Sequence, residues 1–200
     1  MQAHLITIEG IDGAGKSTIA TWVVAWLKQK GVTAILSHEP GGTRAGAKIR
    51  TLLLAEPLGA KAETLLFFAD RAEHVRTVIA PFLQKGVWVV CDRFIDSTFA
   101  YQGGGRGVDE KILEALSDWV LDQTCPNLTF LLDIPVEMAL ARTKRDDRIE
   151  EESKMFFEKV RHTYLQRANK YKNRIVIIDA SQPLEAVQKK VISILQARFP

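Results

Sequence analysis

The chain alternates between two hydrophobic patterns. Short runs that are almost continuous in apolar and β-branched residues are separated by longer stretches in which apolar residues recur at helical spacing. A short continuous run is typical of a strand that is buried on both faces, as in a parallel sheet. The predicted strands are His4–Glu9, Thr33–Ser37, Val87–Asp92, Leu128–Asp133 and Ile175–Asp179.

Helical periodicity fills most of the chain between these runs. Pro135 and Pro183 stand where two of the stretches begin, which is a position that proline favours in a helix. The predicted helices are Ser17–Lys30, Ala60–Gln84, Asp109–Leu121, Val136–Arg145, Glu151–Tyr171 and Leu184–Phe199. Alternation of strands and helices, without an internal repeat or a flexible linker, indicates one α/β domain over residues 1–200. Its core would be a five-stranded parallel sheet flanked by helices.

Four of the predicted strands end in an acidic residue: Glu9, Asp92, Asp133 and Asp179. The carboxyl ends of parallel strands share one edge of the sheet, and ligands of open α/β folds bind beyond that edge. We therefore expect the functional site there.

Composition is that of an ordinary globular protein, with 46% apolar and 26% charged residues. The net charge of +3 is too small to indicate nucleic-acid binding. Cys91 and Cys125 lack metal-ligand spacing, and we identify neither a secretory signal nor a run long enough to span a membrane. The expectation is a cytoplasmic enzyme or binding protein that binds no nucleic acid and no membrane.

The strongest chemical motif is the segment 10–17, which matches G-x-x-x-x-G-K-[ST] between a predicted strand and a predicted helix. Its glycines let backbone N–H groups converge on phosphate oxygens, and the helix N-terminus adds positive charge. Lys16 is expected to reach the β- and γ-phosphates, and Ser17 to bind Mg²⁺. A glycine-rich turn without a ligand is the alternative, and the strand–loop–helix context disfavours it. The predicted triphosphate-binding residues of the loop are Gly10, Ile11, Asp12, Gly13, Ala14, Gly15, Lys16, Ser17 and Thr18.

Asp92 is the predicted partner of Ser17 in the Mg²⁺ site. Asp133 also ends a strand, but it precedes Ile-Pro as a helix-entry residue would. Asp92 is followed by Arg93, a cation placed where a phosphate would bind. The loop thus indicates triphosphate binding and leaves the reaction open, because GTPases, motor ATPases and kinases share it. The sequence has no N-K-x-D pattern for guanine.

Four polar stretches remain to define the acceptor: "HEPGGTRAGAKIR", "LLFFADRAEH", "DRFIDSTFAYQGGGRG" and "RTKRDDRIEEE". Together with "EGIDGAGKST" and "IIDASQPLE", their order resembles the bacterial thymidylate kinases over essentially the whole chain. The resemblance implies a three-layer P-loop kinase fold with a short lid at about residues 141–150. It also implies transfer of phosphate from Mg-ATP to dTMP in dTTP biosynthesis, and a homodimer. The alternatives are another nucleoside monophosphate kinase, a deoxynucleoside kinase and a P-loop ATPase switch.

The same resemblance implies an acceptor site with a ring that stacks on thymine, arginines for the base carbonyl and the monophosphate, and polar groups for the base edge and the sugar. By this resemblance Phe67 is the stacking ring, Arg71 binds the base carbonyl, and Arg93 and Arg50 bind the monophosphate. Thr98 and Gln102 meet the base edge, and the residues near the sugar are Tyr101, Glu39 and Asp12. Taken singly, Phe67 also suits the core, and each arginine suits the surface. Ser181 and Gln182 would border the adenine of ATP. His38 and Phe94 depart from the family pattern, and we assign them no role.

Gly13 bears on the source of catalytic charge, because phosphoryl transfer requires positive charge near the moving group. In the family, one group carries a basic residue directly after the aspartate of the loop, and another supplies arginines from the lid. Gly13 is typical of the second group. As lid arginines in this sequence, Arg145 and Arg148 are favoured over Arg142. The charged run could instead be a solvated surface. The implied catalytic residues are Lys16, Arg93, Arg145 and Arg148.

Overall fold

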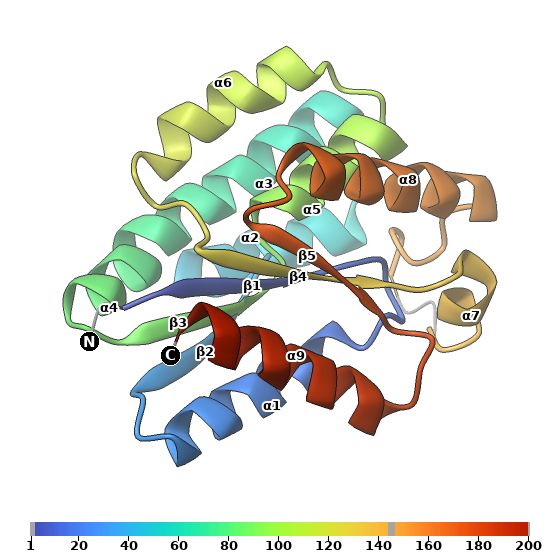
Figure 1. Cartoon of the computed structure of the whole chain (residues 1–200). Coiled ribbons are helices and arrows are strands. Elements are labelled where there is room, and N and C mark those ends of the chain that lie inside the picture. The colour runs from blue at the N-terminus through green and yellow to red at the C-terminus, as the bar shows by residue number, and fades with distance from the viewer. Residues whose placement is uncertain (1–2, 144–146, 200) are drawn as a thin grey trace.

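The computed structural model describes residues 3–143 and 147–199. At its centre, five parallel strands form a sheet in the order β2-β3-β1-β4-β5 (Figure 1). The strands are β1 (Leu5–Glu9), β2 (Ala34–His38), β3 (Trp88–Asp92), β4 (Leu128–Asp133) and β5 (Ile175–Asp179). The predicted parallel sheet is confirmed, and each strand boundary lies within about one residue of its prediction.

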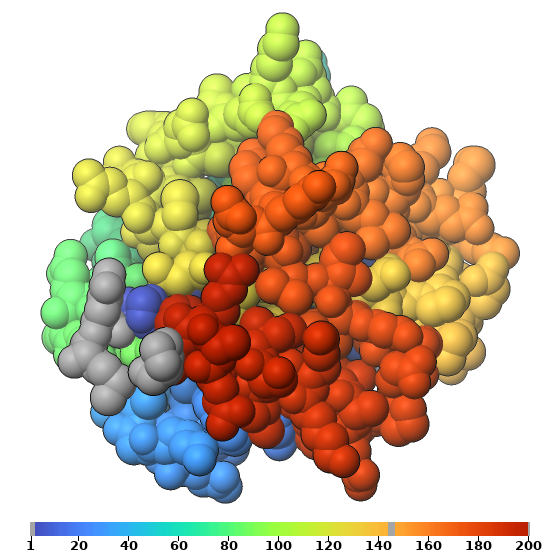
Figure 2. Space-filling model, in the orientation of Figure 1, coloured from blue at the N-terminus to red at the C-terminus, as the bar shows by residue number. Residues whose placement is uncertain are grey.

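Helices cover both faces of the sheet. They are α1 (Lys16–Gln29), α2 (Arg44–Ala55), α3 (Ala60–His74), α4 (Ala80–Gln84), α5 (Ile95–Thr98), α6 (Glu110–Leu121), α7 (Val136–Leu140), α8 (Lys154–Lys170) and α9 (Leu184–Arg198). Helices α1 and α9 lie on one face, and α3, α6 and α8 lie on the other (Figure 1). In the space-filling view, α8 and α9 make up much of the visible face (Figure 2). The arrangement is the expected three-layer α/β fold.

Three predicted helices have different limits in the structure. The helix predicted over Glu151–Tyr171 begins at Lys154, as α8. The predicted helix Ala60–Gln84 consists of α3, a π-helical turn (Val75–Ile79) and α4 in succession. The prediction of a helix over Val136–Arg145 is wrong beyond Leu140, where α7 ends, and Arg145 itself lies outside the described residues. No helix in the described part of the chain is both long and apolar enough to cross a membrane.

Helix α2 is missing from the sequence prediction, because its first turns, "RAGAK", carry no apolar stripe. The structure shows what starts it. Thr43 is the N-cap, and its Oγ1 accepts a hydrogen bond from the backbone N–H of Gly46 at 2.8 Å. The helix then places Arg50 at the carboxyl edge of the sheet, where it lines the cavities described below.

Buried charges tie the segment after β3 to the C-terminal part of the chain. Asp96 in α5 is 1% exposed and accepts hydrogen bonds from Arg167 Nε at 2.8 Å and Arg174 Nη1 at 2.6 Å. Burial opposes ionisation of Asp96, but the bond from Arg174 and the charge of Arg167 hold the pKa of its carboxyl below its ordinary value. The guanidinium of Arg167 also lies 3.7 Å from the ring centroid of Phe99. These contacts fix α5, which carries the predicted acceptor residue Thr98 and lies between Arg93 and the segment with Tyr101 and Gln102.

Asp96→Ala should therefore lower the free energy of unfolding by about 3–5 kcal/mol, because Arg167 would stay buried without its carboxylate. Chemical denaturation followed by circular dichroism measures the change. Asp118→Ala, on the exposed side of α6, is the matched control and should change the same quantity by no more than about 0.5 kcal/mol. Equal effects of the two substitutions would contradict the stabilising role of the cluster.

Candidate active site

The loop between β1 and α1 has the backbone of a phosphate-binding loop. Gly10, Gly13 and Gly15 have φ angles of 140°, 81° and 89°, values that favour glycine. Lys16 is 7% exposed, and its Nζ donates to the carbonyl oxygen of Ile11 at 2.9 Å. The loop borders a cavity of about 740 Å³, which we call the loop cavity. Its lining from the loop and α1 is Asp12, Gly13, Gly15, Lys16, Ser17 and Thr18.

Ser17 and Asp92 meet across the carboxyl ends of β1 and β3. Ser17 Oγ donates to Asp92 Oδ2 at 2.5 Å, whereas Asp92 Oδ1 is buried and has no hydrogen-bond partner. A hydroxyl oxygen beside an unpartnered carboxylate oxygen suits Mg²⁺, which prefers oxygen ligands and is usually completed by water and phosphate. The described residues contain no group of three or more His, Cys, Asp or Glu that could hold a metal alone. The pair therefore fits an ion that arrives with a phosphate.

Arg93 follows β3 and reaches back to the phosphate loop. Its φ of 67° is unusual outside glycine and is found where the surroundings impose it. The guanidinium donates to Asp12 Oδ1 at 2.5 Å, to the Tyr101 hydroxyl at 3.1 Å and to the Gly10 carbonyl at 3.1 Å. Burial opposes ionisation of Asp12, but the charges of Arg93 and Lys16 hold the pKa of its carboxyl well below its usual range. Asp12 and Arg93 are thus a fixed ion pair.

Glu9, at the end of β1, is completely buried beside this pair. Its carboxylate accepts hydrogen bonds from Phe94 N at 2.8 Å, Ser97 Oγ at 2.5 Å and the Tyr164 hydroxyl at 3.0 Å. Ser97 in turn accepts from Arg93 Nη1 at 3.2 Å. Burial raises the pKa of Glu9 to about 7. The acid that ends β1 therefore holds the segment around Arg93 and does not face a ligand.

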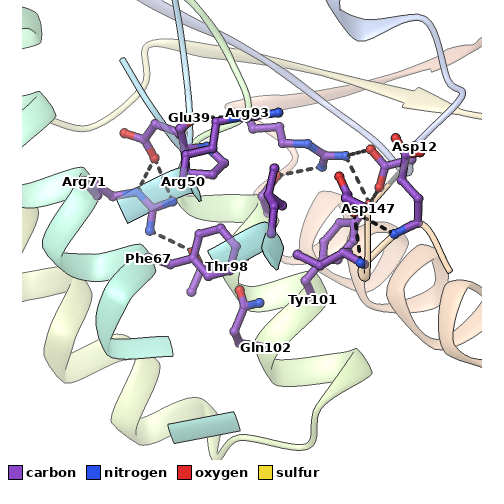
Figure 3. Close-up of a pocket in the computed structure, with 15 residues that line it drawn as sticks. Asp12, Glu39, Arg50, Phe67, Arg71, Arg93, Thr98, Tyr101, Gln102 and Asp147 are labelled. Carbon is purple, nitrogen blue, oxygen red and sulfur yellow. Dashed lines mark hydrogen bonds and ion pairs between the residues drawn. The ribbon is translucent and has the colours of Figure 1, made fainter. Parts of the chain in front are cut away.

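A second cavity, of about 110 Å³, adjoins the first, and we call it the inner cavity. Every residue that the family resemblance assigned to the acceptor lines it: Asp12, Glu39, Arg50, Phe67, Arg71, Arg93, Thr98, Tyr101 and Gln102. Figure 3 shows them converging from α2, α3, the helical segment after β3 and the loops at the strand ends. Phe67, Thr98 and Gln102 gather at one end, and Arg93 and Asp12 lie at the other (Figure 3). The first end also holds the ion pair of Arg71 with Glu39, and the second holds the ion pair of Arg93 with Asp12.

Arg71 is 1% exposed and fixes the wall of the inner cavity. Its Nε donates to Glu39 Oε2 at 2.8 Å, its Nη1 to Thr98 Oγ1 at 2.8 Å and its Nη2 to the Phe94 carbonyl at 2.9 Å. Because Thr98 Oγ1 accepts from Arg71, the hydroxyl proton of Thr98 is available to another acceptor.

His74 supports Glu39 from behind and was not assigned in the sequence analysis. Its Nδ1 lies 2.8 Å from Glu39 Oε1, and its Nε2 lies 2.6 Å from Ser37 Oγ. Gly42 leaves room for the ring, since a Cβ there would lie 2.8 Å from Nε2. The signal in the sequence was the spacing of Arg71 and His74, which are three positions apart on α3 and therefore share a face.

The two cavities meet. Both are lined by Asp12, Glu39, Arg50, Arg93 and Glu150. His38, to which we assigned no role, lines the loop cavity as well. A ligand in each cavity would therefore approach the other at a border made of three carboxylates and two arginines, and the two arginines can neutralise the charge of phosphate groups there.

The predicted lid arginines lie in different places. Arg142 lines the loop cavity. Arg148 lines neither cavity; its Nε donates to the Leu53 carbonyl at 2.7 Å, and its Nη1 lies 2.7 Å from Glu63 Oε2. Arg145 lies outside the described residues. The structure thus brings Arg142, which the sequence analysis ranked lower, next to the phosphate loop.

Some residues predicted to bind ATP do not line the loop cavity. Ile11 and Ala14 are buried within the phosphate loop, 2% and 4% exposed. Ser181 and Gln182 both bond to Asp179, Ser181 Oγ at 2.5 Å and Gln182 Nε2 at 2.9 Å, and they line neither cavity. Their predicted contact with adenine stays a prediction.

The strand order, the phosphate loop after β1 and a second cavity that meets the first at arginines together define a P-loop nucleotide kinase. Comparison with known proteins specifies it further. The sequence model of a family described as "Thymidylate kinase" matches residues 8–191. The chain is 49% identical over 195 residues to the thymidylate kinase of Bordetella pertussis, an alignment that covers 96% of this chain and 94% of that protein.

The thymidylate kinase of Methylobacillus flagellatus is 45% identical over 199 residues, and the alignment covers 98% of each chain. The crystal structure of thymidylate kinase from Ehrlichia chaffeensis superposes with a TM-score of 0.83 at 35% identity, covering 98% of this chain and 100% of that one. The chain belongs to the thymidylate kinase family.

The conformation of Gly13 leads to a prediction about the phosphate loop. A Cβ built on Gly13 would lie 2.2 Å from the carbonyl oxygen of Ala139 in α7, and the φ of 81° is itself unfavourable for alanine. Gly13→Ala should therefore weaken binding of a non-hydrolysable ATP analogue about tenfold or more and lower the free energy of unfolding by at least about 1 kcal/mol.

Isothermal titration calorimetry and chemical denaturation measure the two effects of Gly13→Ala. Gly59→Ala is the control, because a Cβ at Gly59 meets nothing within 4 Å and the φ of −69° is ordinary. Unchanged affinity and stability in Gly13→Ala would mean that α7 yields freely to the loop.

Proposed function

We propose that the protein transfers the γ-phosphate of Mg-ATP to dTMP, which gives ADP and dTDP for dTTP biosynthesis. The observation that carries the proposal is the border between the two cavities, lined by Asp12 and Arg93 on both sides. A phosphate oxygen of dTMP attacks the γ-phosphorus, and the bond to the bridging oxygen of ADP breaks. The acceptor phosphate is already an anion, so the reaction needs no general base.

The loop cavity is the proposed donor site. Backbone N–H groups of the loop and the N-terminus of α1 would hold the phosphates, and Lys16 would exchange the Ile11 carbonyl for a phosphate oxygen. Burial, together with the charge of Arg93, lowers the pKa of Lys16, and a bound phosphate would supply the missing negative charge. Mg²⁺ held by Ser17 and Asp92 would neutralise charge on the β- and γ-phosphates.

The inner cavity is the proposed acceptor site. The end that holds Phe67 suits thymine, with Phe67 as the stacking ring. Arg93 and Arg50 would bind the monophosphate, and Tyr101, whose hydroxyl donates to Asp12 Oδ2 at 2.7 Å, would lie beside the sugar. A separate cavity for an acceptor nucleotide favours a nucleotide kinase over the ATPase-switch alternative, which needs no acceptor site.

We also propose that a second copy of the chain covers one apolar surface. Leu65 of α3, and Ile112 and Trp119 of α6, are 58%, 54% and 79% exposed. Ile112 and Trp119 are seven residues apart and therefore share a helix face. This surface suits the homodimer expected from the family resemblance. A single domain with a lid at about residues 141–150, and a cytoplasmic location, complete the proposal.

Arg93→Ala should lower kcat/KM for dTMP at least about 10³-fold while changing the Kd of an ATP analogue by less than about threefold, because the side chain would bind the acceptor phosphate. Coupled-enzyme kinetics and calorimetry measure the two quantities. Arg76→Ala is the control, because Arg76 is exposed and pairs with Glu73 on the same helical turn. Unchanged dTMP turnover in Arg93→Ala would refute its phosphate role.

Arg148 is the proposed lid arginine, and in that role it would leave Glu63 and Leu53 for the phosphoryl group. Arg148→Ala should then lower kcat about 10³-fold with little change in either KM, as expected for a contact made only in the transition state. Arg142→Ala, measured in parallel, should alter KM for ATP more than kcat, because Arg142 already lines the loop cavity. The reverse pattern would transfer the catalytic role to Arg142.

A further inference from the structure

Glu63, in the first turn of α3, is a buried carboxylate that lines neither cavity. It is 1% exposed, and it accepts a hydrogen bond from Gln102 Nε2 to its Oε1 at 2.9 Å. Arg106 Nε donates to the same oxygen at 3.2 Å, and Arg148 Nη1 lies 2.7 Å from Oε2. A carboxylate surrounded by three donors stays charged. Burial opposes its ionisation, but the hydrogen bonds from Gln102 and Arg148 hold the pKa of Glu63 below its ordinary value.

This charge decides which end of the Gln102 amide faces the inner cavity. An ionised carboxylate only accepts hydrogen bonds, so it requires the NH₂ group of the amide and repels the carbonyl oxygen. With Nε2 directed to Glu63, the Oε1 atom of Gln102 points toward the end of the cavity that holds Phe67 (Figure 3). Within residues 3–143 and 147–199, no group donates a hydrogen bond to this oxygen. The oxygen also keeps some accessible surface, so it can accept a bond from a ligand.

The inner cavity therefore presents a hydrogen-bond acceptor beside its stacking ring. Thymine and uracil carry a donor at N3, whereas cytosine carries an acceptor there. A site that accepts a hydrogen bond from N3–H of thymine or uracil would leave its acceptor unpaired beside cytosine. The acceptor would also repel the cytosine N3 atom. A glutamine that was free to rotate its amide could serve either base.

We propose that Glu63 is a positioning residue for pyrimidine specificity: it locks the Gln102 amide with its oxygen toward the base, so that the site accepts bases with an N3–H and rejects cytosine. The inference rests on the proposed function, since it needs the base of the acceptor to occupy the Phe67 end of the inner cavity. Glu63 itself does not touch the substrate, and its effect passes through Gln102.

The test compares kcat/KM for dTMP, dUMP and dCMP in Glu63→Gln. A glutamine at this position can donate as well as accept, so the Gln102 amide can turn over and offer its NH₂ to cytosine. The dTMP:dCMP ratio should fall about tenfold or more, the worth of roughly one hydrogen bond. The dTMP:dUMP ratio should stay unchanged, because both bases carry the same N3–H. A general loosening of the structure would move both ratios.

Arg106→Gln is the matched control. It removes an ion pair to Glu63 and leaves the bond from Gln102, so both ratios should stay at their wild-type values. Equal loss of dTMP:dCMP discrimination in Arg106→Gln and Glu63→Gln would overturn the proposal, because the effect would then come from lost ion pairs.

Gln102→Leu keeps the proposal testable if Glu63→Gln folds poorly. Leucine cannot accept from N3–H, so kcat/KM for dTMP and dUMP should fall together by about tenfold, and the dTMP:dCMP ratio should fall with them. An unchanged ratio in Gln102→Leu would overturn the proposal.

The same variants separate this inference from the proposed function. If the inner cavity does not hold the acceptor, Gln102→Leu and Arg93→Ala will both leave dTMP turnover unchanged, and the two proposals fail together. If Gln102→Leu changes the ratio but folded Glu63→Gln does not, the acceptor site stands and the role of Glu63 is refuted.

Discussion

The ion pair between Asp12 and Arg93 joins the phosphate loop to the segment that follows β3, and the site is built around it. Ile8 and Asp92 are paired in register across the sheet, so the two loops leave neighbouring strands at the same level. Arg93 then needs a left-handed backbone to turn its side chain toward Asp12. This single contact lies at the border of both cavities, so a shift of either loop would alter the distance between donor and acceptor phosphates.

Around this pair, the protein places several other charges in its interior and pairs each of them. Asp96 is held by Arg167 and Arg174, and Arg71 is held by Glu39. Buried pairs of this kind stabilise little by themselves, because desolvation offsets most of their attraction. Their contribution is geometric, because several hydrogen bonds restrict the rotation of each side chain. A phosphoryl-transfer site depends on fixed positions more than on covalent chemistry.

The sequence predicts most of the fold, because strands buried on both faces have continuous apolar runs whose ends are sharp. Through the family resemblance of short motifs it also names nine residues that line the inner cavity, but not the others that line it, such as Leu54, Asp147 and Ile149. It fails where a role depends on a partner far along the chain. Glu63 meets Gln102 across 39 positions, and His74 meets Glu39 across 35, and neither pairing has a local signal. The sequence analysis does not predict helix α2 for a related reason. The start of α2 depends on the Thr43 cap, and its burial depends on contact with α3.

The contact between Gly13 and the Ala139 carbonyl also bears on how this family can change. Under the proposed function the catalytic charge of this chain comes from the lid, since position 13 is a glycine and has no side chain to supply it. Here no side chain fits at Gly13 until α7 withdraws, so one substitution cannot carry the charge from lid to loop. A lineage that made the exchange would first have to remodel α7. Position 13 and the residues around Ala139, near the end of α7, are therefore expected to vary together among relatives.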